Sequence, residues 1–370
     1  MGGRGSVRDS LADDLHCSRL DSGVRWWDAT VLESGRAISS EATSIGLAGS
    51  AVAAAAVAIV ASYSIARFES VMFPALGISG VDIHKPDGPV RAEMGGLAVL
   101  IALAAGSAVY LGANLTLDGP QVLFAGAALT ITLTGLVGVA DDVVELSQKF
   151  KPFLIVAASI PLMLCLLSRG SIFIPAIGSI HLALLYPLVA VPLAVTTSAN
   201  FSNLLAGFNG LEAGCAAISL GTMAFLSEVT GHPAIAVLGC IAAFAYIGFL
   251  MLNWYPAKIF PGDTGTLMAG ATLAALGLAS GLEFEAIVLS IPAAMDFALK
   301  VMHRHPFKQR HMIGNTRVRT DGTLEPAGYP AVVHAFMKVS PITEKELVVS
   351  LLAMQAVFAS LAIGIGLVFA

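Results

Sequence analysis

Long apolar runs separated by short polar segments dominate this chain. Ten such runs are present, at roughly 45–65, 94–113, 121–140, 153–168, 183–199, 210–227, 233–252, 264–281, 284–300 and 347–369. A helix needs about 20 apolar residues to cross the hydrocarbon core of a bilayer. Small residues are frequent within the runs, as in 51–56, which suits close packing of helices in lipid. The pattern predicts an all-α, polytopic membrane protein with about ten transmembrane helices.

The overall composition supports this prediction. The chain is 56% hydrophobic and 12% charged, about half the charged fraction of an ordinary soluble domain. A large soluble helical protein would need far more polar surface than this sequence supplies. The four cysteines show no CxxC or Cys/His pairing, so no disulfide framework or structural metal site is indicated. The net charge of −5 says little about partners, and we expect no nucleic acid among them.

The basic residues predict the orientation of the protein in the membrane. If the loops after the first, third, fifth, seventh and ninth runs share one side, the opposite loops contain only Arg169. Cytoplasmic loops carry an excess of Lys and Arg, so the first set should be cytoplasmic and both termini outside. That set holds Arg67, Lys85, Arg91, Lys149, Lys151, Lys258, Lys300, Arg304, Lys308, Arg310, Arg317, Arg319, Lys338 and Lys345.

The chain divides into a polar arm and a membrane domain. Residues 1–44 are polar and mixed in charge, and they lack the apolar segment of a secretory signal. We expect this arm to be poorly ordered. Residues 45–370 form the predicted ten-helix catalytic domain, which includes a long cytoplasmic loop at 301–346.

Carboxylates and amides occur where apolar runs end on the predicted cytoplasmic side. Asp263 lies in a glycine-flanked turn between two apolar runs, and a charge so close to hydrocarbon is costly unless it serves a site. Asp141 and Asp142 are adjacent at a run's end, and both can ionise comfortably only if a cation is near. Lys151 or a divalent metal would supply that charge.

The types of side chain indicate a substrate class. Oxygen ligands such as Asp263, Asn203 and the aspartate pair suit Mg²⁺ or Mn²⁺ better than zinc. The basic loop at 303–305 would neutralise a diphosphate, with arginine suited to bidentate contacts. Phe260 would stack on a flat base and Asn209 would bond its edge. Together these features indicate a nucleotide diphosphate handled at a membrane surface.

From about residue 75 to 365, the chain resembles the polyprenyl-phosphate N-acetylhexosamine-1-phosphate transferase superfamily. Bacterial members carry Asn-x-x-Asp-Gly-x-Asp-Gly after the fifth span, and this chain has Asn203-Leu-Leu-Ala206-Gly-Phe-Asn209-Gly. That version, with Asn253-Trp-Tyr-Pro and Phe260-Pro-Gly-Asp263-Thr, is similar to the eukaryotic and archaeal dolichyl-phosphate GlcNAc-1-phosphotransferases.

The resemblance implies a ten-helix architecture with a cytoplasmic active site, here in the plasma membrane of a prokaryote. It implies transfer of GlcNAc-1-phosphate from a UDP-sugar donor, UDP-GlcNAc, to a dolichyl or other polyprenyl phosphate, with release of UMP. This is the first step of lipid-linked oligosaccharide assembly for N-glycosylation. Mg²⁺ is the implied cofactor, with Mn²⁺ as an alternative, and a homodimer is left open.

The resemblance also assigns roles to residues. The catalytic group is Asp141, Asp142, Lys151 and Asp263; the metal ligands are Asn203 and Asp263; the substrate-binding group is Lys85, Glu93, Asn209, Phe260, Arg304 and His305. One motif departs from the family, whose loop reads His-x-x-Arg-His-Arg where this chain has His303-Arg-His-Pro-Phe-Lys. Arg310 or His311 would share the roles of that loop.

Several alternatives stay open at this point. The same chemistry with another UDP-N-acetylhexosamine would serve cell-envelope glycan synthesis. Direct attack by the lipid phosphate is favoured over a covalent aspartyl-phosphate route. A secondary transporter would place its ionisable residues near the bilayer midplane in repeated halves, whereas these charges cluster at helix ends. A catalytically silent scaffold is disfavoured by the intact set Asp141, Asp142, Asn203 and Asp263.

Overall fold

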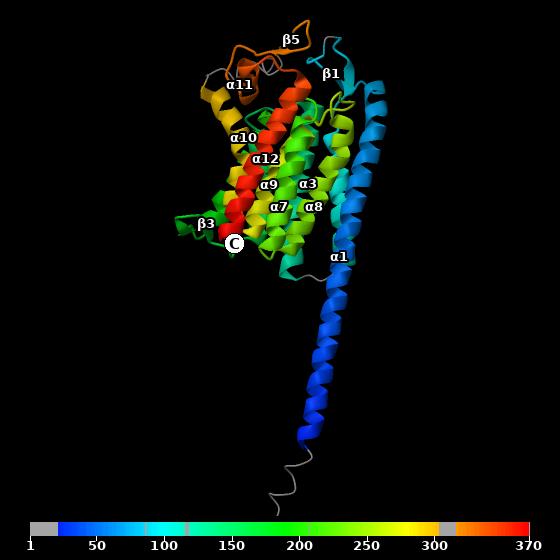
Figure 1. Cartoon of the computed structure of the whole chain (residues 1–370), viewed down its shortest axis with the longest axis vertical. Helices are drawn as coiled ribbons and strands as arrows, with labels where there is room; N and C mark the ends of the chain where they lie inside the picture. The colour runs from blue at the N-terminus through cyan, green and yellow to red at the C-terminus, as the bar shows by residue number, and fades with distance from the viewer. Residues whose placement is uncertain (1–20, 86, 115–117, 206, 303–315, 370) are drawn as a thin grey trace, which may run out of the picture. The chain divides into compact units, whose positions relative to one another are not determined.

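The computed structural model describes residues 21–85, 87–114, 118–205, 207–302 and 316–369 (Figure 1). The helices are α1 (Asp21–Ala75), α2 (Gly96–Ala113), α3 (Gly119–Val144), α4 (Lys151–Ala158), α5 (Ile160–Cys165), the π-helix η1 (Tyr186–Ala190), α6 (Val191–Leu204), α7 (Leu211–Val229), α8 (Pro233–Asn253), α9 (Gly262–Ser280), α10 (Glu283–Met302), α11 (Val332–Val339) and α12 (Glu344–Phe369).

Each of the ten predicted apolar runs coincides with helix in the described residues. The fourth run is split between α4 and α5, and the fifth is η1 followed by α6. Among the described residues, five helical segments are long and apolar enough to cross a membrane on their own: Ala48–Ala75, Gly96–Ala113, Gly119–Val144, Pro233–Asn253 and Glu344–Phe369. A mainly helical membrane fold is therefore confirmed, whereas ten crossings stay a prediction.

Three short antiparallel hairpins were not expected from the sequence. They pair β1 (Ser79–Val81) with β2 (Val90–Ala92), β3 (Ser171–Ile174) with β4 (Gly178–His181), and β5 (Arg317–Val318) with β6 (Leu324–Glu325). Strands of two to four residues are too short to show an alternating pattern. The first hairpin matters for the site, because the Phe260 N–H donates to the Ala92 carbonyl at 2.8 Å and so ties β2 to the segment before α9.

Contacts between Cα atoms divide the chain into residues 1–50 and residues 51–370. Every site residue discussed below lies in the second unit. The predicted polar arm lies partly outside the described residues, and from Asp21 onward its backbone is helical as the first part of α1. The division into an arm and a catalytic domain stays a prediction.

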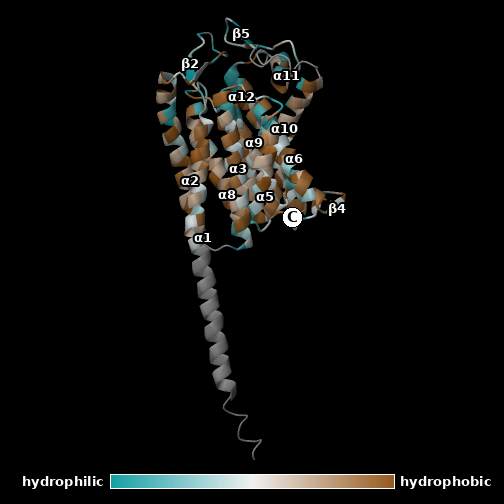
Figure 2. Ribbon diagram, turned by 180° about the vertical axis from the view of Figure 1, so that it is seen from behind, coloured by the Kyte–Doolittle hydropathy of each residue, from teal (hydrophilic) through white to brown (hydrophobic). Residues whose placement is uncertain are grey.

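Within the second unit, the polar loops gather at one end of the helices. β1, β5 and α11 lie together at that end, and the β3 hairpin lies at the opposite end (Figure 1). Hydrophobic residues cover the sides of the helices, while hydrophilic residues concentrate near β2, β5 and α11 (Figure 2). Hydrogen bonds join the C-terminal ends of α3 and α6 to the N-terminal ends of α4 and α9, so residues distant in sequence meet there.

The helix α9 is the centre of this arrangement. It packs against α2, α3, α6, α7, α8 and α10, and every residue from Thr264 to Ser280 is buried. Two glycines permit this packing, because a Cβ on Gly96 would overlap the backbone of Gly265 and one on Gly138 would overlap that of Thr264. The Gly95 and Gly96 N–H groups also donate, each at 2.8 Å, to carbonyls of the segment before α9. The N-terminus of α9 is therefore held from several sides.

Candidate active site

A buried lysine joins two of the predicted catalytic carboxylates. The Lys151 ammonium lies 2.6 Å from an oxygen of Asp141 and 2.6 Å from an oxygen of Asp263. Lys151 and Asp141 are almost fully buried, whereas the Asp263 side chain is 33% exposed. Buried charges of this kind are stable only when paired. Lys151 therefore supplies a cation beside Asp141, as the adjacent aspartates were expected to require. Asp263 is the member of this group that is accessible from outside.

Asp142 has different partners from its neighbour. It accepts hydrogen bonds from the Asp263 N–H at 2.7 Å, the Thr264 N–H at 3.0 Å and the Thr264 hydroxyl at 2.6 Å. These are unpaired donors of the first turn of α9, which a carboxylate stabilises by capping and by interaction with the helix dipole. Gly262 has φ of +65°, and a Cβ there would press against the Asp142 carboxylate. The glycine of the turn is thus required for this cap.

Asn203, near the end of α6, orients Asp263 from the other side. Its amide nitrogen donates to Asp263 Oδ1 at 2.8 Å and to the Thr266 hydroxyl at 2.8 Å. Asp263 is therefore fixed by Lys151 through one oxygen and by Asn203 through the other. In the described residues, the second oxygen of Asp141 is buried and accepts no hydrogen bond. The donor set is made of carboxylate and amide oxygens, which fits Mg²⁺ or Mn²⁺.

A cavity of about 280 Å³ opens beside this group, close to the lower end of the volumes usual for ligand pockets. Three of the predicted substrate-binding residues, Glu93, Asn209 and Phe260, lie on its wall. The full lining is Val81, Asp82, Ile83, His84, Glu93, Asn203, Gly207, Phe208, Asn209, Glu212, Asn253, Phe260, Pro261, Gly262, Asp263 and Thr266. The predicted metal ligands and the predicted base contacts thus face one space.

Two titratable groups of the cavity wall are shifted by their surroundings. Desolvation raises the pKa of the Glu93 carboxyl, and the negative charge of Asp142 raises it further. Burial lowers the pKa of His84 to about 4, against the opposing effect of Asp82. The imidazole is therefore neutral near pH 7, and it stacks on Phe208 with ring centroids 4.3 Å apart. This stack provides a flat, uncharged patch on the wall.

Lys85, predicted to bind substrate, lies in a second ion cluster. Its ammonium pairs with Glu344 and lies 3.4 Å from Asp82. The Asn209 amide nitrogen donates to the same Asp82 at 2.9 Å. Lys85 is not one of the described residues that line the cavity, and it contacts the lining residue Asp82 and, outside the lining, Glu344.

The structure thus unites most of the predicted site. Polar contacts link Asp141 to Lys151, Lys151 to Asp263 and Asp263 to Asn203, while Arg304, His305, Arg310 and His311 lie outside the described residues. Sequence reasoning missed the roles of Thr264 and Thr266, although both follow Asp263 closely. It also missed Glu344, which in the sequence is an ordinary acidic residue at the start of an apolar run.

Comparison with known proteins agrees with this geometry. Residues 124–281 match the model of glycosyl transferase family 4. A Saccharolobus solfataricus protein, named for UDP-N-acetylglucosamine–dolichyl-phosphate N-acetylglucosaminephosphotransferase, is 32% identical over 77% of this chain and 87% of its own length. The Dictyostelium discoideum protein of that name is 27% identical over 65% of this chain and 67% of its own length. A phospho-N-acetylmuramoyl-pentapeptide-transferase from Halalkalibacterium halodurans is 30% identical over 59% of this chain and 69% of its own length.

The matched region contains Asp141, Lys151, Asn203 and Asp263, the residues that the structure brings together. The similarity to the Saccharolobus protein extends further, over 287 residues. This chain belongs to glycosyl transferase family 4.

Proposed function

We propose that this protein transfers GlcNAc-1-phosphate from UDP-GlcNAc to a dolichyl or other polyprenyl phosphate and releases UMP. This is the first step of lipid-linked oligosaccharide assembly for N-glycosylation. The observation that carries the proposal is the link from Asp141 through Lys151 to Asp263 at the edge of the cavity. The names of the archaeal and Dictyostelium relatives support the same donor and acceptor.

The donor would occupy the cavity with its diphosphate at Asp263 and its base toward Asn209 and Phe260. The Asn209 amide nitrogen is already held by Asp82, so its carbonyl oxygen remains to accept from a base N–H. Phe260 offers a ring for stacking. Glu93 lies on the same wall, near the proposed sugar or nucleotide end of the donor. Arg304 and His305 would cover the pyrophosphate and the sugar.

Asp263 and Asn203 would hold a divalent ion, Mg²⁺ or alternatively Mn²⁺, through their oxygens. The bound ion would supply positive charge against the diphosphate. Lys151 keeps Asp263 oriented from the opposite side, and Asp142 fixes the backbone that carries Asp263. Most of the catalytic effect then comes from positioning and charge neutralisation, as is usual in phosphoryl transfer.

The acceptor would approach from the lipid side, along the gap between α3 and α4. An apolar groove of about 360 Å³ lies there, lined by Leu133, Leu136, Val137, Ala140, Leu154, Ala157 and Ala158. Ala140 directly precedes Asp141, and Leu154 lies one helical turn after Lys151. A polyprenyl chain in this groove would therefore bring its phosphate to the Asp141–Lys151 pair.

In the reaction, an oxygen of the lipid phosphate attacks the β-phosphorus of the donor. The bond from that phosphorus to the oxygen bridging it to the α-phosphate breaks, and UMP leaves with the electron pair. Asp141 orients the attacking phosphate or takes its residual proton through the carboxylate oxygen that has no described partner. A covalent aspartyl-phosphate intermediate is the alternative, and it predicts exchange of labelled UMP into UDP-GlcNAc without acceptor.

We further propose ten membrane crossings, with the site on the cytoplasmic face of a prokaryotic plasma membrane. The one-sided distribution of Lys and Arg supports this orientation. The alternative donor, another UDP-N-acetylhexosamine for cell-envelope glycans, has support from the name of the Halalkalibacterium relative. A secondary transporter has no comparable support, because the charges of the site, Asp141, Lys151 and Asp263, meet at the ends of α3, α4 and α9.

The decisive experiment supplies the purified protein with several UDP-sugars and a polyprenyl phosphate, with and without chelator. Mass spectrometry of the lipid fraction and quantification of UMP should show a GlcNAc-pyrophosphoryl lipid formed only when a divalent metal is present. If a lipid product forms with UDP-GalNAc but not with UDP-GlcNAc, the donor is another UDP-N-acetylhexosamine. Formation of no lipid-linked pyrophosphate, together with ion-coupled uptake in proteoliposomes, would replace the enzyme with a transporter.

A further inference from the structure

Glu344 connects the start of α12 to two loops that flank the cavity. It is 4% exposed, and one of its carboxylate oxygens accepts from the Asn209 backbone N–H at 2.9 Å. The other oxygen pairs with the Lys85 ammonium. Glu344 itself does not line the cavity in the described structure. Glu344 therefore contacts residues that would bind the donor, but it would not contact the donor itself.

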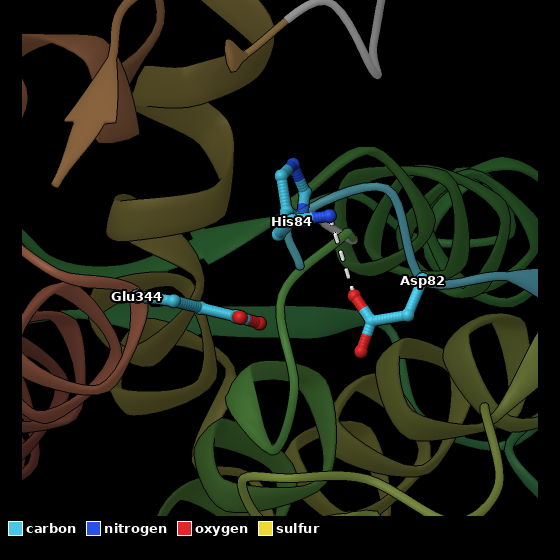
Figure 3. A group of neighbouring side chains, drawn as sticks. All are labelled: Asp82, His84 and Glu344. Atoms are coloured by element: carbon cyan, nitrogen blue, oxygen red, sulfur yellow. Dashed lines mark hydrogen bonds between the residues drawn. The ribbon is translucent and has the colours of Figure 1, made fainter. Parts of the chain in front are cut away.

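Asp82 completes the connection from the opposite side. Its oxygens accept from the Asn209 amide nitrogen at 2.9 Å and from the His84 backbone N–H at 3.3 Å. Figure 3 shows the carboxylates of Asp82 and Glu344 approaching from opposite sides and pointing toward one another. The Lys85 ammonium bonds Glu344 and lies 3.4 Å from Asp82, and it also lies 4.1 Å from the centre of the Tyr255 ring.

The chemistry of this cluster favours an ammonium over a metal ion. Ligand atoms of Asp82, His84 and Glu344 lie within 4.8 Å of one another, which is the composition of many metal sites. However, Lys85 already brings its positive charge to both carboxylates. A metal ion at the same place would face repulsion from that ammonium and would need to displace it. The cluster is therefore an ion pair that fixes the backbone around it.

We infer that Glu344 is a positioning residue for the nucleotide end of the donor, acting through Asn209 and Lys85. This inference rests on the proposed function. Both the backbone and the side chain of Asn209 are held by the cluster, and Asn209 is 3% exposed. The neighbouring Phe208 stacks on His84 from the other loop. Loss of the Glu344 charge would release the two loops from each other and spoil the fit of the base.

The test compares Glu344→Gln and Glu344→Ala with wild type in steady-state kinetics. Glutamine keeps an oxygen for the Asn209 N–H but loses the charge that pairs with Lys85. Because hydrogen bonds to charged groups are among the stronger ones, the KM for UDP-GlcNAc should rise by about 10-fold or more with glutamine, and further with alanine. The KM for the polyprenyl phosphate and kcat should stay within about twofold, because the Asp141–Lys151–Asp263 group is untouched.

Glu346 provides a matched control in the same helical turn. It is exposed, and its carboxylate accepts from the backbone N–H and hydroxyl of Thr343 at the start of α12. Glu346→Gln perturbs the beginning of the helix but not the cavity wall, so both KM values should remain those of wild type. A double variant, Glu344→Gln with Lys85→Met, should show a KM for UDP-GlcNAc no higher than the worse single variant, because the two residues act as one pair.

The outcomes separate this inference from the proposed function. If wild type forms no GlcNAc lipid, the proposed function fails, whatever the variants do. If wild type is active and Glu344→Gln lowers only the temperature of unfolding, with both KM values unchanged, Glu344 is structural and the inference is overturned. It is also overturned if wild type binds a further Mn²⁺ that Glu344→Gln loses, since the cluster would then be a metal site.

Discussion

The carboxylate of Asp142 accepts two hydrogen bonds from Thr264, one from its backbone N–H at 3.0 Å and one from its hydroxyl at 2.6 Å. Its neighbour Asp141 pairs instead with Lys151. The two adjacent aspartates, which look equivalent in the sequence, therefore act differently. Asp142 holds the helix that carries Asp263, whereas Asp141, which follows Ala140 of the apolar groove, is the residue proposed to act on the acceptor phosphate.

This difference predicts distinct effects of substitution at position 142. Asp142→Ala removes the cap of α9 and should destabilise the protein by about 1 kcal/mol, within the usual range for N-cap losses. Activity should fall with it, because the backbone of Asp263 loses a partner. Asp142→Asn keeps an acceptor oxygen and should retain more activity and stability. Thermal unfolding in detergent and transfer assays measure both. An Asp142→Ala protein of unchanged stability but without activity would show that Asp142 contacts substrate.

Lys151 should be essential, while its near neighbour Lys149 should not. Lys151→Met leaves Asp141 buried and Asp263 without their shared cation, and breaking a buried ion pair costs about 3–5 kcal/mol. If the lower end of that cost is lost from the stabilisation of the transition state, the rate of transfer falls by about 100-fold. We therefore expect the rate of transfer to fall by at least about 100-fold. Lys149 is exposed, and Lys149→Met should retain activity near that of wild type. Comparable activity in both variants would contradict the assignment.

The apolar pattern was sufficient to predict where the helices lie, because each run is long and almost wholly apolar. α3 and α8, for example, lie within a few residues of the runs at 121–140 and 233–252. The hairpins were missed because strands of two to four residues carry no period. The number of crossings is less directly predicted, since a helix such as α9 is buried by other helices and needs no lipid-facing apolar surface.

The site was predictable in its members but not in its pairings. Acidic residues at helix ends near hydrocarbon are costly, which drew attention to Asp141, Asp142 and Asp263. The sequence could not show that Lys151 bridges the first and the last, because that contact depends on how α3, α4 and α9 pack. Glu344 was missed for a related reason. An acidic residue in the first turn of a helix is ordinary, and only the fold brings it to Asn209.

Asp263→Ala should abolish turnover. The substitution removes the carboxylate proposed to hold the metal and leaves Lys151 and Asn203 without a common partner. Removal of divalent ions with a chelator should have the same effect on wild type, and added Mg²⁺ should restore it. Asp321→Ala is a suitable control, because Asp321 is exposed and bonds only to Thr323 among the described residues. Near-normal turnover by Asp263→Ala would refute the proposed metal ligand.

Filling the groove between α3 and α4 should weaken binding of the lipid alone. Ala157 lines the groove, so Ala157→Phe should raise the KM for polyprenyl phosphate several-fold and leave the KM for UDP-GlcNAc unchanged. Val156 is on the same helix, is 41% exposed and does not line the groove. Val156→Phe should therefore leave both KM values unchanged. An equal effect of the two variants on the lipid would place the acceptor chain elsewhere.

Stability should depend on pH through His84. Burial lowers the pKa of His84 to about 4, from 6.5 when unfolded, so between these values the unfolded chain binds the extra proton. The neutral imidazole thus contributes stability that is fully present above pH 6.5 and is lost as the pH falls toward 4. At about 1.4 kcal/mol per pKa unit, the full loss is about 3.5 kcal/mol.

His84→Phe isolates this contribution, because phenylalanine keeps the stack on Phe208 but cannot titrate. The melting temperature of wild type should fall more steeply than that of the variant between pH 6.5 and 4, whereas the two curves should run parallel above pH 7. Asp82 and Lys85, the charged groups next to His84, are present in both proteins, so the two proteins differ only in the side chain at position 84. Parallel curves over the whole range would mean that the imidazole is hydrated and free to protonate in the folded protein.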